Sequence, residues 1–277
     1  ATNTTASHNT GIGRNALKLN TTGADNTAIG DEALTANTTA ANNTAVGRNA
    51  LAANTTGTRN IAIGAYALDA SDTENDNLAI GYTAMTVDTA GGTRNVAVGN
   101  YVLDALTSGD DNAAVGYQAM SANNAGNYNT AVGSYSLDAN TTADSNTAVG
   151  YNALTANTTG ATNVAVGSSA LQTNITTSYN TAVGHESLKT NIAAENTAVG
   201  YRSLYLNTTG AENVALGERA LTANTTASNN TALGRISMFA NTTGANNTAV
   251  GNNSLRTNTT GASNVAVGYT ALYTNNG

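Results

Sequence analysis

The chain has 277 residues, with 28 Gly and no Pro, Cys or Trp, and only 10% of its residues are charged. Low charge without proline excludes an extended disordered chain, and the lack of cysteine excludes a disulfide framework and thiolate metal sites. The net charge of −7, with only 10 Lys and Arg, argues against nucleic-acid binding. No apolar run has the length of a membrane helix, so we expect no membrane insertion.

The sequence repeats with a period of 17 residues. Residues 146–162 read NTAVGYNALTANTTGAT, and residues 163–179 read NVAVGSSALQTNITTSY. Sixteen copies follow one another, and we number each from the Asn that opens it as position 1. Because self-similarity at a fixed period indicates a repeat architecture, we expect residues 1–277 to form a single repeat array.

Two copies depart from the period. The glycine at position 5 recurs at steps of 17 except for a step of 18 to Gly99 and a step of 16 to Gly200. The extra residue lies near Gly91, and the missing one lies near Ala193. Both changes fall between the periodic segments, where a turn tolerates a change of length.

In the first half of each repeat, the pattern predicts a short strand, which covers 146–150 in the example. Side chains alternate along a strand, so Thr147 and Val149 at positions 2 and 4 are expected to face the core. Position 3, which is Ala in every copy except Gly11, then faces away from the core. Gly150 is expected to turn the chain, because a residue without Cβ tolerates positive φ.

In the second half, a second strand is expected over 153–157. Leu154 at position 9 and the residue at position 11 would point inward, and position 10 would point to water. The Asn-Thr-Thr-Gly segment at 157–160 has the composition of a turn.

One such coil per repeat predicts an all-β fold, a parallel β-solenoid of sixteen coils. With coils about 4.8 Å apart, the array would be a rod roughly 75 Å long. The Asn column at position 1 is expected to form a side-chain ladder, unless Asn is present only as a turn former. Replacing Val149 with Asp should then unzip several coils, because it would bury an unpaired charge.

The motifs NTAVG, NVAVG and NIAIG resemble the SVAIG-type motif of the YadA-like head of trimeric autotransporter adhesins. The resemblance extends over the whole chain and implies a left-handed parallel β-roll in which three chains associate side by side. The family's usual repeat is a few residues shorter, and the Asn-Thr-Thr-Gly turn accounts for the difference. Similar repeats occur in viral tail fibres, so the resemblance implies a surface fibre more directly than an autotransporter.

The alanine column at position 3 bears on partners. A row of small side chains allows close approach of another chain, which favours a subunit interface; alternatively, the alanines pack beneath an inward-folded turn or are simply exposed. Neither end of the array carries a capping sequence, and solenoids normally need caps. We therefore expect either a window from a longer fibre or a subunit that stacks end to end, and a homo-oligomer (a trimer or a filament).

No residue stands out as catalytic, cofactor-binding or metal-binding. The two histidines, His8 and His185, lack HExxH spacing, and the GxG at 11–13 lacks a phosphate-loop context. A paired-carboxylate site would normally break the pattern of its scaffold, and the acidic clusters, which lack the spacing of calcium-binding β-rolls, are expected to be solvated turns. These clusters are Asp72, Glu74 and Asp76, and Asp110 and Asp111.

Tyrosine is concentrated after the Gly turn. Eight of the 12 tyrosines lie at positions 6 or 7, where we expect an exposed edge. Exposed rings with a polar tip suit binding of sugars or proteins; alternatively, they cover the hydrophobic seam and add rigidity. They are Tyr66, Tyr82, Tyr101, Tyr117, Tyr135, Tyr151, Tyr201 and Tyr269.

Asn-x-Thr sequons recur at position 12. They could carry glycans in a eukaryotic secretory pathway, or they are turn chemistry that spells a sequon. Their asparagines are Asn3, Asn20, Asn37, Asn54, Asn140, Asn157, Asn174, Asn207, Asn224, Asn241 and Asn258.

These features predict a structural and adhesive segment of an extracellular or virion surface fibre, not an enzyme, that binds glycans or surfaces and needs no cofactor. A self-polymerising extracellular filament and an ice-binding β-solenoid are the alternatives. Ice binding needs a regular outward array, typically of Thr, whereas the expected outward position 10 is irregular and most regular Thr lies in the turn at positions 13 and 14.

Overall fold

The computed structural model describes residues 5–87 and 92–275. The chain divides into two compact units, Ala1–Ala143 (unit 1) and Asp144–Gly277 (unit 2). Both units are built in the same way, from a strand of three residues in each repeat followed by turns. No described segment forms a helix long and apolar enough to cross a lipid bilayer.

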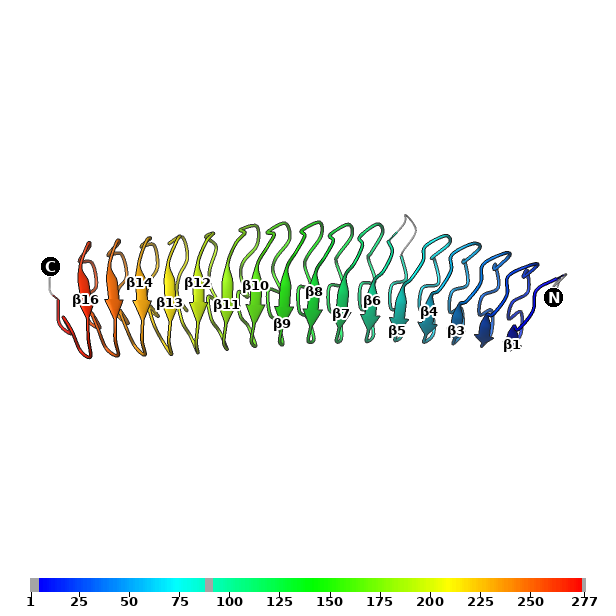
Figure 1. Ribbon diagram of the computed structural model, residues 1–277, viewed down its shortest axis with the longest axis horizontal. Coiled ribbons are helices and arrows are strands. Elements are labelled where there is room, and N and C mark those ends of the chain that lie inside the picture. Colours follow the sequence, from blue (N-terminus) through cyan, green and yellow to red (C-terminus); the bar gives the residue numbers. More distant parts are fainter. Residues whose placement is uncertain (1–4, 88–91, 276–277) are drawn as a thin grey trace. The chain divides into compact units, whose positions relative to one another are not determined.

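Within each unit, every strand pairs in parallel with the next one along the chain, so the fold is the predicted all-β parallel β-solenoid with one coil per repeat (Figure 1). The strands of unit 1 are β1 (Thr10–Ile12), β2 (Thr27–Ile29), β3 (Thr44–Val46), β4 (Ile61–Ile63), β5 (Leu78–Ile80), β6 (Val96–Val98), β7 (Ala113–Val115) and β8 (Thr130–Val132). Those of unit 2 are β9 (Thr147–Val149), β10 (Val164–Val166), β11 (Thr181–Val183), β12 (Thr197–Val199), β13 (Val214–Leu216), β14 (Thr231–Leu233), β15 (Thr248–Val250) and β16 (Val265–Val267).

The strands stay in register across both irregular repeats. Ala79 still pairs with Ala97 across the longer step, and Ala182 still pairs with Ala198 across the shorter one. The extra residue was placed near Gly91 and Gly92, of which Gly91 lies outside the described residues. At the shorter step, the side-chain amide of Asn191 donates to the carbonyl oxygen of Ala193, two residues along the chain, at 2.6 Å. In a full repeat the corresponding acceptor lies three residues along, as for Asn224 and Ala227.

The predicted facing of the first strand is wrong, because its alternation is inverted. Ala at position 3 is fully buried, as at Ala148, and the flanking residues Thr147 and Val149 lie on the surface. The coil is too narrow for two branched side chains per strand, so the small side chain points inward and the large ones point outward. The alanine column is therefore core, and the prediction that it forms a subunit interface is wrong.

The predicted second strand is also wrong, although its largest side chain was placed correctly. Positions 6 to 11 form turns, closed by bonds from the amide of Ala153 to the carbonyl of Gly150 (3.3 Å) and from the amide of Asn157 to the carbonyl of Leu154 (3.2 Å). Leu154 at position 9 is fully buried, as predicted. Position 11 was expected to point inward but lies on the surface, as at Leu206.

Hydrogen bonds between coils continue around this turn segment. The backbone amide of Leu154 donates to the carbonyl oxygen of Ala170 in the next coil at 2.9 Å, and the backbone amide of Ser169 donates to the carbonyl oxygen of Tyr151 at 2.9 Å. Leu154 can take part only because its φ is +53°. Burial of the leucine contributes roughly 2 kcal/mol, which offsets the cost of this left-handed conformation, about 1–2 kcal/mol for a residue with a Cβ.

The glycine at position 5 is required by both conformation and packing. Gly150 has a φ of +134°, and a Cβ on it would lie 2.7 Å from the carbonyl carbon of Gly167 in the next coil. The predicted turn at this glycine is confirmed. Because no Cβ separates them, the backbones of successive coils approach each other closely at this column.

Candidate functional surfaces

The strand face is the outward surface formed by positions 2 and 4 in each unit. Ile29 and Val115 remain 37% and 39% exposed although they have paired strands on both sides, and Ile61 remains 40% exposed. Position 4 is Val, Ile or Leu in every coil, and position 2 is Thr in nine of sixteen. Parallel pairing in register repeats both columns about every 4.8 Å, so the strand face is a regular strip with one apolar column beside a column that is mostly Thr.

The predicted side-chain ladder at position 1 is confirmed, and both backbone and side-chain amides donate to it. The backbone amide of Asn213 donates to Oδ1 of Asn196 in the preceding coil at 3.0 Å. The side-chain amide of Asn213 donates to the carbonyl oxygen of Ala227, at position 15 of its own coil, at 2.9 Å. Each asparagine therefore both links two coils and closes its own coil.

A second asparagine ladder, at position 12, was not predicted. Nδ2 of Asn224 donates to Oδ1 of Asn207 in the preceding coil at 2.7 Å and to the carbonyl oxygen of Ala227 at 2.9 Å. The two ladders thus meet on one carbonyl per coil. These buried amides are satisfied by hydrogen bonds, as buried polar groups must be.

The second ladder decides how the sequons are interpreted. The sequon asparagines that the structure describes are at most 2% exposed; Asn3 lies outside the described residues. Because Nδ2 is the glycan attachment atom and here donates within the core, a glycan on it is incompatible with the folded coil. The sequon spelling therefore reflects a structural asparagine followed by a Thr-rich turn.

The cluster of Asp72, Glu74 and Asp76 lies where the second ladder is interrupted. Ser71 replaces the asparagine of position 12, and Oδ1 of Asn54 in the preceding coil has no hydrogen-bond partner among the described residues. The carboxylate of Glu74 folds inward and accepts bonds from Ser71 Oγ at 3.0 Å and from the amide of Asp72 at 2.7 Å. Glu74 is 3% exposed, so the prediction of a wholly solvated turn is wrong for this residue.

The other carboxylates of the predicted clusters are engaged by different groups. Asp76 pairs with Arg59 at 2.6 Å, and Asp111 pairs with Arg94 at 2.7 Å. Asp110 accepts from the amide of Thr93 at 2.7 Å. The side-chain hydrogen bonds from Arg59 and Arg94 hold the pKa values of Asp76 and Asp111 below the usual range. Within 5–87 and 92–275, no three His, Cys, Asp or Glu side chains form a group able to hold a metal ion.

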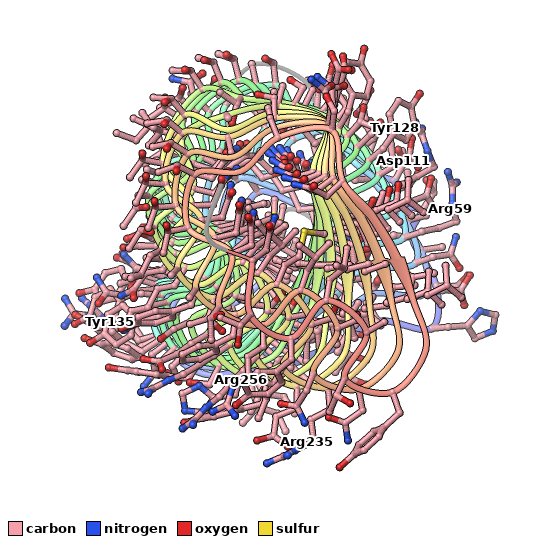
Figure 2. The ribbon with its side chains drawn as sticks, turned by 90° about the vertical axis from the view of Figure 1, so that its left-hand side faces the viewer. Arg59, Asp111, Tyr128, Tyr135, Arg235 and Arg256 are labelled. Atoms are coloured by element: carbon pink, nitrogen blue, oxygen red, sulfur yellow. The ribbon has the colours of Figure 1, made fainter. Side chains whose placement is uncertain are left out.

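These ion pairs form a charged edge at position 17, which alternates in sign from Arg59 through Asp76 and Arg94 to Asp111. Figure 2 shows Arg59, Asp111 and Tyr128 on one side of the coils and Tyr135 on the other. The two histidines lie in different units. His8 faces Asp25 at 3.2 Å on the charged edge, and His185 faces Glu186 at 4.0 Å.

The tyrosine edge, formed by positions 6 and 7, is where the sequence predicted it. In unit 1, five rings in consecutive coils meet edge to face with centroids 5.5–6.2 Å apart, and they alternate between positions 7 and 6. Such pairs contribute about 0.5–1.5 kcal/mol each beyond burial. The rings are Tyr66, Tyr82, Tyr101, Tyr117 and Tyr135, of which Tyr82 and Tyr117 are exposed.

In unit 2 the same edge is both aromatic and cationic. The Arg202 guanidinium lies 5.2 Å from the ring centroid of Tyr201 and 5.0 Å from that of Tyr205. Arg219, in the next coil, lies 5.7 Å from the centroid of the Tyr201 ring. The ring of His185, in the preceding coil, meets Tyr201 edge to face at 5.8 Å. Tyr201 and Tyr269, like Tyr151, are exposed as predicted.

The sequence analysis missed the strand face and the cationic part of the tyrosine edge, although the sequence contains a signal for each. A position that is always Ala or Gly beside a variable branched residue indicates a site where only a small side chain fits, and this would have placed position 3 inside. The cationic edge emerges when basic residues are sorted by repeat position instead of by order along the chain. Comparisons with family models, with curated proteins and with solved structures found no match to this chain.

Proposed function

We propose that the chain is a rigid structural and adhesive segment of an extracellular or virion surface fibre, in which identical chains associate side by side through the strand face. The observation that carries this proposal is the unbroken apolar column at position 4, exposed beside a column of Thr and Val. The function requires no catalytic step and no cofactor.

The size and regularity of the strand face support a second copy of the chain as its partner. Eight coils at about 4.8 Å give a strip of about 34 Å in each unit, two side chains wide. Contiguous apolar surface of this extent marks an interaction site on most proteins. A strip with a single repeat distance also matches itself in register, and the resemblance to trimeric adhesin heads suggests three chains.

The proposal is tested by the native mass, measured by light scattering after size exclusion, with negative-stain images of the same peak. A mass of three chains in short rods would support it, whereas long filaments would favour the self-polymerising subunit instead. A stable monomer would overturn association of either kind.

A paired variant separates association from folding. Val149→Asp with Val183→Asp places charges on the strand face of unit 2 and should dissociate the assembly while the far-ultraviolet β signal remains. The matched control, Thr159→Asp with Thr176→Asp, adds the same charge at exposed positions off that face and should leave the mass unchanged.

Ice binding is a second candidate, favoured by the outward Thr column at position 2. The sequence placed this column inward; on the strand face it instead offers methyl and hydroxyl groups at a fixed spacing of about 4.8 Å. Thermal hysteresis of the dissociated Val149→Asp, Val183→Asp variant and of the wild type would test this candidate, and normal ice growth in both samples would sink it.

A further inference from the structure

Five consecutive coils of unit 2 each carry one basic residue, and all five lie in the turn segment of positions 6 to 11, which includes the tyrosine edge. These residues, the basic row, account for every Lys and Arg of unit 2 and occupy only positions 6, 7 and 10. Figure 2 shows Arg235 and Arg256 on the same side of the coils. The basic row is Lys189, Arg202, Arg219, Arg235 and Arg256.

Aromatic rings lie between the members of the basic row. Lys189 and Arg202 flank the Tyr205 ring at 5.8 and 5.0 Å, and Arg256 lies 5.4 Å from the Tyr273 ring. Cation–π contacts of this kind restrain the guanidinium and ammonium groups. A ligand that binds them therefore encounters cations whose positions are partly fixed in advance, which lowers the entropic cost of binding.

Most of the acidic residues of unit 2 lie away from this turn segment. Three of the five, Asp144, Glu195 and Glu212, lie at the end of the repeat, on the edge that carries position 17. Glu186 and Glu218 lie on the tyrosine edge and pair with members of the basic row. With five basic and two acidic residues, the turn segment of unit 2 has a net charge of about +3, in a chain whose net charge is −7.

Ion pairs engage only part of the basic row. Glu186 accepts from both Lys189 (2.6 Å) and Arg202 (2.7 Å), and Glu218 accepts from Arg235 (3.1 Å). Arg219 and Arg256 form no ion pair among the described residues; the guanidinium of Arg219 lies near the Tyr201 ring, and that of Arg256 lies near the Tyr273 ring and donates to its hydroxyl. These two guanidinium groups are the ones free to bind an external anion in a bidentate manner.

We infer that the basic row binds a linear acidic polysaccharide that carries one carboxylate on each sugar ring. Coils about 4.8 Å apart present one cation per coil within the turn segment, so the cations follow one another in the stacking direction, and an extended polyuronate advances by a similar distance per ring. A nucleic-acid duplex fits less well, because each of its strands carries a phosphate about every 3.4 Å and winds away from the stacking direction that the basic row follows. The tyrosine rings add apolar surface for the C–H faces of the sugars.

This inference deepens the adhesive part of the proposed function. The test is binding of the full chain to polygalacturonate as a function of salt, measured by isothermal calorimetry or biolayer interferometry. We expect binding that weakens steeply with salt, because the contacts are electrostatic and surface-exposed. The methyl-esterified polymer, which keeps the sugar chain but loses the charge, should not bind.

The decisive variant is Arg219→Gln with Arg256→Gln, which should weaken binding at least about tenfold through the loss of two charge-assisted contacts. The matched control, Arg59→Gln with Arg94→Gln, makes the same charge change on the charged edge of unit 1 and should retain wild-type affinity. Circular dichroism and the native mass of both variants show whether folding and chain association are intact, so loss of polysaccharide binding is distinguished from loss of the proposed assembly.

Three outcomes would overturn the inference. These are salt-independent binding or none at all, equal binding of the esterified polymer, and equal weakening by the control variant. Tighter binding of single-stranded DNA or of anionic lipid vesicles than of polygalacturonate would also overturn it and assign the basic row to that partner.

Discussion

At the residue scale, each complete coil holds non-glycine residues in the left-handed backbone region at positions 7 and 9 and at the residue just before the next Asn, among the residues that the structure describes. Asn and Asp tolerate this region best, and β-branched residues tolerate it least. The chain nevertheless places Thr162 and Ile236 there, with φ values of +58° and +57°. These residues are held by the hydrogen bonds of adjacent coils, so the strain is local and can be relieved by substitution.

Thr162→Asn should raise the free energy of unfolding by about 1 kcal/mol, because asparagine adopts the left-handed conformation at lower cost. Thr162 is exposed, so packing contributes little to the difference. Chemical denaturation of the variant beside Thr159→Asn, at an exposed site without positive φ, checks this prediction. Equal midpoints for the two variants would contradict it.

Two glycine substitutions should have opposite signs. Gly11→Ala supplies the Ala that every other repeat has at position 3, and its Cβ would lie at an ordinary 3.7 Å from the nearest atom. We expect it to stabilise the fold by about 0.5–1 kcal/mol through the entropy of the unfolded chain. Gly150→Ala places a Cβ against the next coil at positive φ and should cost more than about 2 kcal/mol. Thermal melts of both variants decide the matter.

At the element scale, the strand of each coil is defined by which residue points inward. Ala148 is fully buried and pairs with Ala165 of the next coil. We expect Ala148→Asp to abolish cooperative unfolding of the surrounding coils, at a cost of about 4 kcal/mol or more. The neighbouring Val149→Asp should leave the β signal and melting temperature of the folded chain nearly unchanged. A larger loss of melting temperature for Val149→Asp than for Ala148→Asp would support the facing predicted from the sequence.

The ion pairs of Glu186 link the turn segments of two coils and predict a pH dependence. A side-chain hydrogen bond from Lys189, followed by one from Arg202, lowers the pKa of Glu186 below its ordinary 4.5 despite desolvation. A lowered folded-state pKa contributes stability that is complete above pH 4.5 and is lost as the pH falls through the folded-state pKa. The stability difference between the wild type and Glu186→Gln should therefore shrink below pH 4.5. A difference that is constant down to pH 2 would contradict this.

At the scale of the whole molecule, the period, the parallel stacking and the buried Leu column could be predicted because they depend only on self-similarity and hydrophobicity. The inverted strand could not, since alternation alone permits both facings and the choice depends on the width of the coil. The second strand failed because Leu at position 9 gives no local sign that it adopts positive φ. Hydrogen bonds from neighbouring coils impose that conformation, and they exist only after stacking.

The surfaces were predictable to different degrees. The tyrosine edge was located from position alone, because residues beside an obligatory glycine turn are forced outward. The role of position 12 was not, because Asn157 in an Asn-Thr-Thr-Gly segment looks like turn chemistry. Its burial depends on the asparagine of the following coil, Asn174, a relation between residues 17 apart that local rules do not contain.

The paired asparagine ladders have a consequence for the lifetime of the protein. Asparagine is among the residues that limit proteins at high temperature, because its side chain can cyclise onto the following backbone nitrogen and deamidate. Here the amides of positions 1 and 12 are buried, and their hydrogen bonds hold the side chain in place. Cyclisation would require the coil to open first. The abundance of asparagine in this chain is therefore compatible with slow chemical ageing, and damage should begin at the exposed turn asparagines.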